Sequence, residues 1–309
     1  MNRDEPGPVG RVIAPLGEII EAYPVTGGAS RDRKFKVHFY GYDSAYLLRL
    51  FDDSSLPVKR NEFEALHRMQ ALTVHCSRPI AMGRWEPEGL YFLLVSFIEG
   101  VDAAAALPLS PKPQQLRIGI QAGEELRRIG GYAAPEGVTG WARRRLEASE
   151  RDIGLLRERG VSFRGAQEAA ALTLRGGELM QGRPSSFLHG SFRPANLIVQ
   201  SGRLAGIVGF GQFGWGDPLY EFAGLPVHAR DVSALFCTGQ ILGYHGGQEP
   251  CPEFWSLYAL YAAMGVFAAL AQAAEHAPER LPAVIAQAER LGDDHNGFAA
   301  EKPDWFAEL

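Results

Sequence analysis

The chain has 309 residues, 46% of them hydrophobic and 22% charged, and it carries a net charge of −5. Such a chain is long enough for two lobes around a large buried core. Its mildly acidic balance argues against nonspecific binding to nucleic acid, which needs a basic surface. Three widely spaced cysteines, Cys76, Cys237 and Cys251, match neither a disulfide framework nor a zinc site, which favours a cytoplasmic protein.

The first third of the chain is predicted to be rich in strands. Its N-terminal sequence MNRDEPGPVG has no apolar run, so we expect no signal peptide. Residues 8–60 contain strand-like alternation separated by turn-rich stretches such as GGASRD at 27–32. Residues 59–75 have helical spacing, and residues 87–100 return to a strand that ends before Gly100.

From about residue 110 the pattern is mostly helical. Residues 111–131 form one predicted helix with a Gly-Gly stop, and residues 139–160 form another that begins at Thr139. Residues 255–274 are apolar enough for a membrane span, but they are rich in Ala, contain Ser256 and Gln272, and have no basic flank. We therefore expect a buried core helix and no association with a membrane.

This order of elements, strands first and helices afterwards, predicts an α+β protein with two lobes. We expect a small β-rich lobe over residues 1–99 and a larger helical lobe over residues 100–309. The joint should fall near Phe97–Val101, where a short apolar strand ends in Glu99-Gly100.

The most informative stretch runs from Phe187 to Ala223. Two short apolar runs, LIV and LAGIV, flank the turn Gln200–Arg203 and predict a β-hairpin between two polar loops. The stretch resembles the catalytic segment of the aminoglycoside phosphotransferase and choline kinase family, where H-G-D-x-x-P-x-N, a hairpin, I-D-F or I-D-W, and G-D-P-x-x-D-L-A follow in order. The matching elements are His189-Gly190, Pro194, Asn196, the hairpin, Phe210 and Trp215-Gly216-Asp217-Pro218.

The resemblance implies a protein-kinase-like fold whose first lobe binds a nucleotide. It places a Gly-rich turn over the phosphates, Arg49 as the phosphate-pairing cation and Glu62 as the salt-bridge partner of that cation. The residues that it assigns to the nucleotide are Gly27, Gly28, Ser30, Arg49, Glu62 and Phe97. A plain hairpin turn explains the glycines equally well, and Arg49 and Glu62 also fit an edge-strand charge and a solvated helix residue.

The sequence departs from the family at two acidic positions that carry the chemistry. The aspartate after His-Gly, which in the family orients and deprotonates the acceptor hydroxyl, is Ser191 here, and a neutral alcohol is no useful base near pH 7. The aspartate of the I-D-F element, which in the family chelates Mg²⁺, is Gly209. Gln212 stands where members often have another acid, and Glu221 replaces the aspartate after G-D-P-x-x.

These losses weigh most heavily on the metal. A general base contributes on the order of 10²–10⁴ in rate, whereas Mg²⁺ neutralises the phosphates and fixes their geometry. Asn196 is the residual metal ligand, a single neutral oxygen, while Mg²⁺ normally takes at least one carboxylate, so we expect no stable Mg²⁺ site. Arg49 and Arg193 still offer positive charge to an anionic ligand.

The same loop admits a hydrolase reading, with His189 as a base beside Ser191. The segment lacks the G-x-S-x-G elbow and the strand-to-helix turn after it. We expect His189 to hold the loop by hydrogen bonding, and Asn196 to be either a leftover ligand or a structural residue of the loop. Asp217 before a proline is expected to bind nearby backbone amides.

The leading hypothesis is a pseudokinase that binds a nucleotide such as ATP, a small molecule or a partner protein. The alternative is an active ATP-dependent O-phosphotransferase, acting on a small hydroxylated molecule or on a peptide Ser/Thr in natural-product biosynthesis. It needs a rerouted metal site that uses Glu221 or a carboxylate from a partner. The acceptor region of the family corresponds to residues 138–182 of this chain, and Trp215 and Phe213 either pack in the core or line a ligand pocket.

Overall fold

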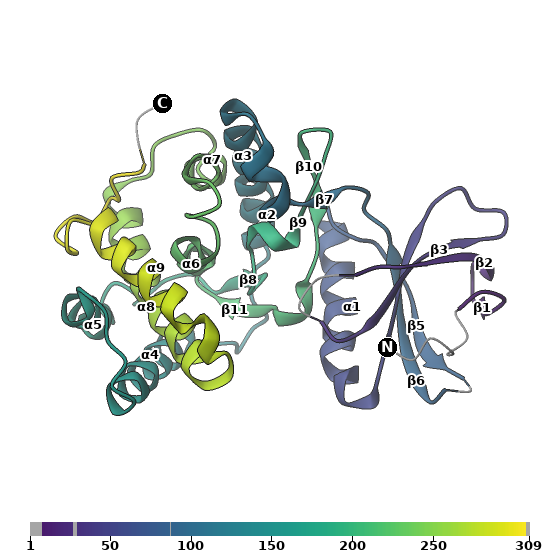
Figure 1. The fold of residues 1–309 in the computed structure, drawn as a ribbon, viewed down its shortest axis with the longest axis horizontal. Helices are drawn as coiled ribbons and strands as arrows, with labels where there is room; N and C mark the ends of the chain where they lie inside the picture. Colours follow the sequence, from purple (N-terminus) through teal and green to yellow (C-terminus); the bar gives the residue numbers. More distant parts are fainter. Residues whose placement is uncertain (1–7, 27–29, 87, 307–309) are drawn as a thin grey trace. The chain divides into compact units, whose positions relative to one another are not determined.

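The computed structural model describes residues 8–26, 30–86 and 88–306, which form two compact units (Figure 1). The first unit comprises the chain up to Gly100 together with Ala205–Phe213, and the second comprises Val101–Leu204 and the chain from Gly214 onward. Strands dominate the first unit and helices dominate the second.

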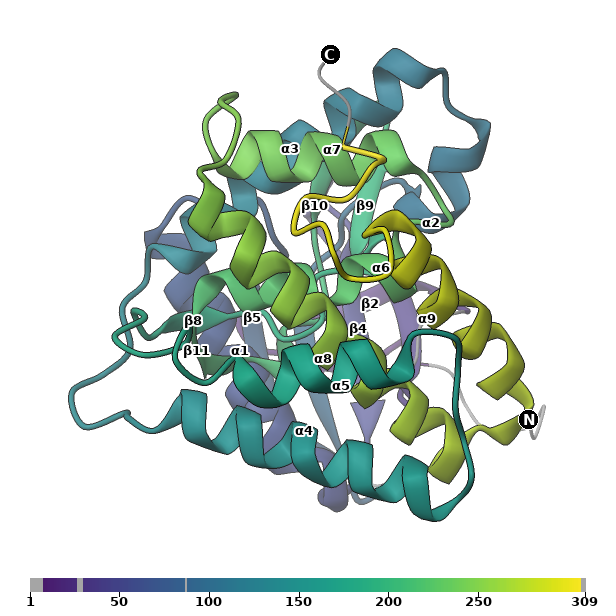
Figure 2. The same cartoon turned by 90° about the vertical axis from the view of Figure 1, so that its left-hand side faces the viewer.

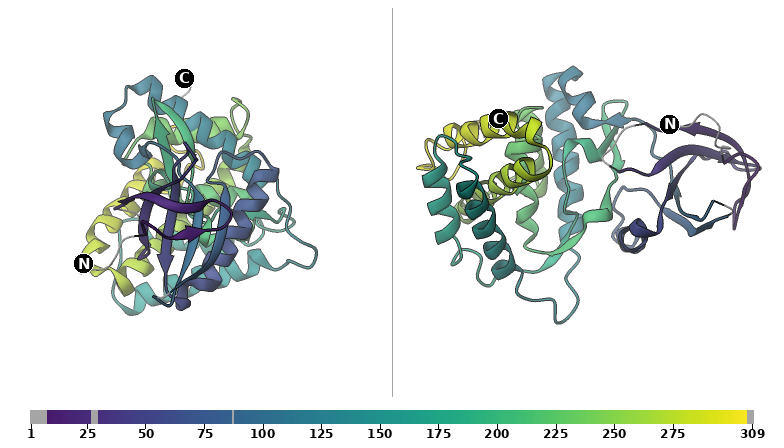
Figure 3. Two further views of the ribbon diagram at one scale, coloured as in Figure 1. Left: turned by 90° about the vertical axis from the view of Figure 1, so that its right-hand side faces the viewer. Right: turned by 60° about the horizontal axis from the view of Figure 1, so that its bottom comes forward.

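The first unit is built on an antiparallel sheet, seen in the left-hand view of Figure 3. Its six strands have the order β1-β2-β3-β4-β6-β5. The helix α1 begins after the 3₁₀ turn η1 and contacts β5 and β6. The elements are β1 (Val12–Ile13), β2 (Gly17–Pro24), β3 (Arg33–Phe39), β4 (Tyr46–Phe51), η1 (Asp53–Ser55), α1 (Leu56–Ala71), β5 (Pro79–Trp85) and β6 (Leu90–Ser96).

The alternation of residues along strand β4 determines which face of the sheet its single basic residue, Arg49, points to. Successive side chains of a strand point to opposite faces of the sheet. Tyr46, Leu48 and Leu50 are buried in the hydrophobic cluster of the sheet, together with Val37 and other apolar residues. Arg49 therefore points to the other face of the sheet, where its guanidinium reaches Glu62 on α1.

The segment Ala205–Phe213 returns to the first unit from far along the chain. The Ile207 N–H donates to the carbonyl oxygen of His75 at 2.8 Å, and Ile207 forms a parallel bridge with Cys76. The 3₁₀ helix η4 (Phe210–Gln212) then packs on α1. The first unit is thus completed by residues more than one hundred positions beyond its other strands.

The second unit is mostly helical, with short strands around the stretch 186–216. Its two small sheets have the orders β10-β9-β7 and β11-β8, and the division between the units passes through β10. The elements are β7 (Val101–Asp102), α2 (Ala103–Ala106), η2 (Leu107–Leu109), α3 (Lys112–Gly130), α4 (Trp141–Glu158), α5 (Ala166–Arg175), β8 (Ser186–Leu188), η3 (Pro194–Asn196), β9 (Leu197–Gln200), β10 (Arg203–Ile207), β11 (Gly214–Gly216), η5 (Pro218–Gly224), α6 (Leu225–His228), α7 (Ala234–Tyr244), α8 (Pro252–His276), η6 (Pro278–Arg280) and α9 (Leu281–Asp294).

The core of the second unit is the apolar helix α8. Trp255, Tyr258 and Tyr261 are buried, as expected from their helical spacing. The helix is long and apolar enough to cross a membrane, but 78% of its most apolar 18-residue stretch is buried inside the protein. Burial against α4, α5, α9 and η5 explains its composition, which is that of a core helix.

The helices α3 and α7 lie side by side at unusually short range (Figures 1 and 2). Gly119 and Gly123 on α3 face Gly239 and Gly243 on α7. A Cβ atom added at Gly123 would lie 2.0 Å from the carbonyl oxygen of Gln240, and one added at Gly243 would lie 2.0 Å from that of Ile120. Only glycine permits this approach of the two backbones.

Two local expectations can be compared directly with the structure. The hairpin is confirmed: β9 and β10 flank Ser201 and Gly202, whose φ angles of 48° and 74° are those of a two-residue hairpin turn. The Thr start of the helix at 139–160 is wrong, because α4 is capped by Gly140 with φ 74°. The carbonyl oxygen of Thr139 instead accepts from Arg144 Nη1 at 2.6 Å.

Candidate functional site

The first unit contains a buried ionic cluster around Arg49. Its Nη1 donates to Glu62 Oε1 at 2.7 Å, which confirms the predicted pairing of these two side chains. Two further members were missed by the sequence reasoning: Asp32 Oδ2 accepts from Arg49 Nε at 2.7 Å and from Lys59 Nζ at 2.6 Å. The spacing of Lys59 and Glu62, three residues apart on one helix, was the available signal for Lys59.

The other residues assigned to a nucleotide are Gly27, Gly28, Ser30 and Phe97. Gly27 and Gly28 lie outside the described residues. Ser30 Oγ accepts the N–H of Asp32 at 3.0 Å. Phe97 is half-buried, and the Nζ of Lys36 lies 4.8 Å from the centre of its ring. Their roles toward a nucleotide stay predictions.

Gly209, at the position that the family resemblance assigns to the metal aspartate, also belongs to the first unit. Gly209 has φ 87° and caps η4, so a left-handed residue begins this turn. Gly211, two residues on, lies next to the Glu62 carboxylate, since a Cβ added there would be 3.5 Å from Oε2. Gly209 brings no ligand atom beyond its backbone, and Asp and Asn are the side chains best tolerated in its conformation.

The loop after β8 is held together by its own polar side chains. The Nδ1 of buried His189 accepts the N–H of Ser191 at 3.2 Å. Asn196 Nδ2 donates to the carbonyl oxygen of Ser191 at 2.8 Å and to its Oγ at 3.1 Å. The predicted hydrogen-bonding role of His189 is thus observed. Of the two roles expected for Asn196, these bonds match that of a structural residue that stabilises the loop.

Glu221 also stabilises this loop, by a hydrogen bond to its backbone. Its Oε1 accepts the N–H of Gly190 at 2.9 Å, and the side chain is buried. Burial raises the pKa of Glu221 to about 7, although the backbone N–H groups of Gly190, His189 and Phe192 pull it downward. A carboxyl group that is half protonated near pH 7 and bonded to backbone amides is a poor substitute ligand for Mg²⁺.

Asp217 is a structural node, as its place before Pro218 predicts. Its Oδ1 accepts the N–H of Leu219 at 3.0 Å. Its Oδ2 accepts from Arg183 Nε at 2.7 Å and from the hydroxyl of Tyr261 at 2.8 Å. These bonds fix the start of η5 to α8, and thereby the position of Glu221.

Arg193 brings positive charge to the loop. Its Nε is buried and has no hydrogen-bond partner among the described residues. Burial lowers the pKa of the nearby His228 imidazole to about 4, with further lowering by the charges of Arg193 and Arg280. This imidazole is therefore neutral at pH 7, and the positive charge of this part of the unit rests on the two arginines.

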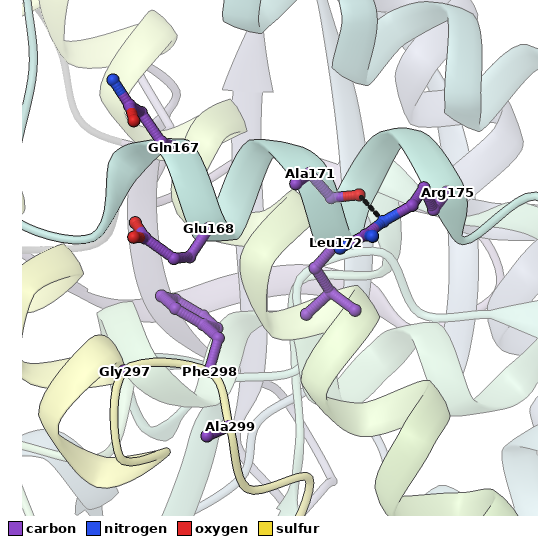
Figure 4. Close-up of a pocket in the computed structure, with 8 residues that line it drawn as sticks. All are labelled: Gln167, Glu168, Ala171, Leu172, Arg175, Gly297, Phe298 and Ala299. Atoms are coloured by element: carbon purple, nitrogen blue, oxygen red, sulfur yellow. Dashed lines mark hydrogen bonds between the residues drawn. The ribbon is translucent and has the colours of Figure 1, made fainter.

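A separate hollow of about 390 Å³ lies between α5 and the segment Gly297–Ala299 (Figure 4). Its wall on α5 belongs to the stretch 138–182 assigned to the acceptor region. Phe298 has φ 65°, a strained conformation for a bulky residue, and its ring stacks on buried His295. The lining residues are Gln167, Glu168, Ala171, Leu172, Arg175, Gly297, Phe298 and Ala299.

The residues present do not fit an ordinary Mg²⁺ site. Gly209 has no carboxylate, Asn196 is tied to Ser191 through its amide nitrogen, and Glu221 is tied to the loop backbone. Among the described residues there is also no group of three or more His, Cys, Asp and Glu side chains that could hold a metal.

Comparison with known proteins gives one clear family. Residues 21–258 match the model of the phosphotransferase enzyme family. None of the curated proteins compared matches the chain. Solved structures do: the chain is 16% identical to a thermostable mutant of aminoglycoside phosphotransferase APH(4)-Ia in a ternary complex with AMP-PNP and hygromycin B, over 92% of this chain and 96% of that one, with a TM-score of 0.64.

Two further structures give the same result. The GDP complex of wild-type aminoglycoside 2′-phosphotransferase-IIIa is 13% identical, with 90% of this chain and 94% of that chain covered and a TM-score of 0.66. The gentamicin–APH(2″)-IIa complex is 14% identical, with 88% and 94% covered and a TM-score of 0.60. At these identities the likeness concerns the fold, and it confirms the expected two-lobed kinase-like architecture with a β-rich N-terminal sheet and a helical C-terminal part.

Proposed function

Because the chain belongs to the phosphotransferase enzyme family, we propose that it uses the kinase-like fold to bind a ligand and does not carry out ordinary Mg²⁺-dependent phosphoryl transfer. The observation that carries this proposal is the absence of a carboxylate at both Ser191 and Gly209. Without them the chain lacks the base for the acceptor hydroxyl and the charged ligand for the metal.

The contacts of the remaining polar groups support the same reading. A metal site that uses a different carboxylate would need Glu221, but this carboxyl group is buried and accepts the N–H of Gly190 in the loop. Asn196 offers at most one neutral oxygen, since its nitrogen donates twice to Ser191. Neither side chain can leave its place without breaking the hydrogen bonds that hold the loop.

The kind of ligand is proposed from what the fold retains. The similar structures contain AMP-PNP with hygromycin B, GDP, or gentamicin. In this chain the Arg49–Glu62 pair is formed at 2.7 Å, which favours a nucleotide in the first unit. The hollow on α5 is within the size range of small-molecule sites. A partner protein is the remaining alternative.

The active O-phosphotransferase is tested directly by turnover. We expect the wild-type chain to show no Mg²⁺-dependent conversion of ATP to ADP, with or without hydroxylated acceptors. Binding is measured in parallel by the shift in melting temperature on titration with ATP or GDP, with and without Mg²⁺. A ligand that binds the native state stabilises it by about 2.7 kcal/mol at one hundred times its dissociation constant.

Asn196→Ala provides the decisive comparison, with Asn61→Ala, at an exposed position of α1, as the matched control. Mg²⁺-dependent turnover that disappears in Asn196→Ala and persists in Asn61→Ala would overturn the proposal in favour of an active kinase. A nucleotide shift that needs no metal would support the binding function. If no nucleotide produces a shift, the ligand is a small molecule or a protein of another class.

A further inference from the structure

The cations of the first unit are already bound to an internal carboxylate. Asp32 lies between Ser30 and the first residue of β3. One of its oxygens, Oδ2, accepts from Arg49 Nε at 2.7 Å and from Lys59 Nζ at 2.6 Å, and it lies 2.7 Å from Arg49 Nη2 as well. Two nitrogens along one edge of the guanidinium are therefore occupied by Asp32.

Glu62 occupies the remaining edge of the guanidinium. Its Oε1 accepts from Arg49 Nη1 at 2.7 Å, and its Oε2 lies 3.7 Å from Lys59 Nζ. All four side chains are between 6% and 13% exposed, so water screens their charges little. These two cations and two carboxylates balance in charge, and Lys34, which pairs with Arg49 across β3 and β4, adds a third cation close enough to feel the charges of all four.

The neighbouring cations keep Asp32 ionised at neutral pH. Burial alone would raise the pKa of this carboxyl, but the charges of Arg49 and Lys59 outweigh burial and lower it below the usual value. Asp32 is therefore ionised throughout the physiological range. Its contribution to stability is present above the pKa of an unfolded aspartate and is lost only as the pH falls through the lower pKa of the folded state.

We propose that Asp32 sets the anion affinity of the first unit by holding Arg49 and Lys59 in the place of a ligand phosphate. This inference rests on the proposed binding function in the form in which the ligand of the first unit is a nucleotide. A phosphate and a carboxylate use the same edge of a guanidinium. An incoming anion must displace Asp32 from both cations, so the native affinity for polyphosphates is low unless something releases this side chain.

The direct test compares Asp32→Asn with wild type in binding to inorganic tripolyphosphate without metal, measured by calorimetry. Asn keeps the size of the side chain and removes its charge. A neighbouring arginine typically lowers the pKa of an aspartate by about 1–3 units, which is a ten- to thousandfold effect, so we expect binding at least about tenfold tighter in the variant. Asp43→Asn, at an exposed position of the same unit, makes the same change in net charge and should bind like wild type.

A second pair of variants keeps the test valid if Asp32→Asn does not fold. Lys59→Met removes one cation, and Asp32→Asn combined with Lys59→Met removes one charge of each sign. We again expect at least about tenfold tighter binding in the double variant than in Lys59→Met alone. Equal affinity within either comparison would overturn the role of Asp32.

The outcome for Asp32 is separable from the outcome for the proposed function. Turnover of ATP by the wild type would refute the binding function but would leave the tripolyphosphate comparison unaffected, because no metal and no transfer are involved. Conversely, an inactive protein whose tripolyphosphate affinity is unchanged by Asp32→Asn would keep the binding function and overturn the inference on Asp32.

Discussion

The close contact of α3 and α7 gives the sharpest test of the second unit. In Gly123→Ala, the new Cβ would lie 2.0 Å from the Gln240 carbonyl oxygen and 2.6 Å from the Tyr244 nitrogen. Carbon atoms in this position essentially never come closer than 3.0 Å to another heavy atom, so the backbones must separate by about 1 Å. Both obstructing atoms are backbone atoms, and no rotamer change can relieve the overlap.

The magnitude follows from two opposing effects. Overpacking typically costs about 1–3 kcal/mol, and we take about 3 kcal/mol because only movement of a helix relieves it. Alanine is favoured over glycine inside a helix by about 1 kcal/mol. The net loss is about 2 kcal/mol, which lowers the melting temperature by about 4–8 °C for a unit of this size.

The matched control is Gly154→Ala on α4, where an added Cβ meets nothing within 4 Å. This variant gains helix propensity without overlap and should melt up to about 2–4 °C higher than wild type. Both variants are compared by urea denaturation and by thermal melting followed by circular dichroism. If Gly123→Ala were as stable as wild type, or if Gly154→Ala lost as much as Gly123→Ala, the steric argument would be refuted.

Two further predictions concern the loop and the two positions to which the family resemblance assigns aspartates. Because burial raises the pKa of Glu221 from 4.5 to about 7, the folded state holds a proton that the unfolded state releases, so stability should fall by about 3 kcal/mol as the pH rises from about 4.5 to above 7. Glu221→Gln should flatten this dependence in urea denaturation at a series of pH values, and an unchanged slope would contradict the burial argument. Restoring both acids, as Ser191→Asp with Gly209→Asp, should produce Mg²⁺-dependent ATP turnover in a coupled ADP assay. The stability cost should be about 1–2 kcal/mol, because the new aspartate must adopt the left-handed conformation that Gly209 has now. Each single variant serves as the control, and turnover in the double variant no higher than in a single variant would count against the assignment.

Much of the fold was predictable because it depends on local patterns. The hairpin at Ser201-Gly202 and the buried helix α8 follow from alternation, turn residues and apolar length. The Arg49–Glu62 pair was predictable only through the resemblance, since thirteen residues separate its members. The predicted start of α4 was wrong because the chain enters the helix through Gly140 in a left-handed conformation that the pattern of residue types does not reveal.

The remaining features of the candidate site could not be predicted from the spacing of residues along the sequence. Asp32 precedes a strand like any turn residue, and only the folded chain shows that it binds Arg49 and Lys59. The pKa of Glu221 depends on burial by residues distant in sequence. The glycines of α3 and α7 did carry a signal, because each helix has two of them four residues apart and thus on one face.

The return of Ala205–Phe213 to the first unit has a consequence for biosynthesis. A chain that emerges from the ribosome in order can form the six-stranded sheet once Gly100 is out, but α1 still lacks its contacts with η4. The first unit therefore reaches its final structure only after residue 213 has emerged from the ribosome, by which point about two thirds of the chain has emerged. A fragment that ends at Gly100 should accordingly expose the surface of α1 that η4 covers. A rearranged fragment in which residues 205–213 are joined to the rest of the first unit should keep this surface covered.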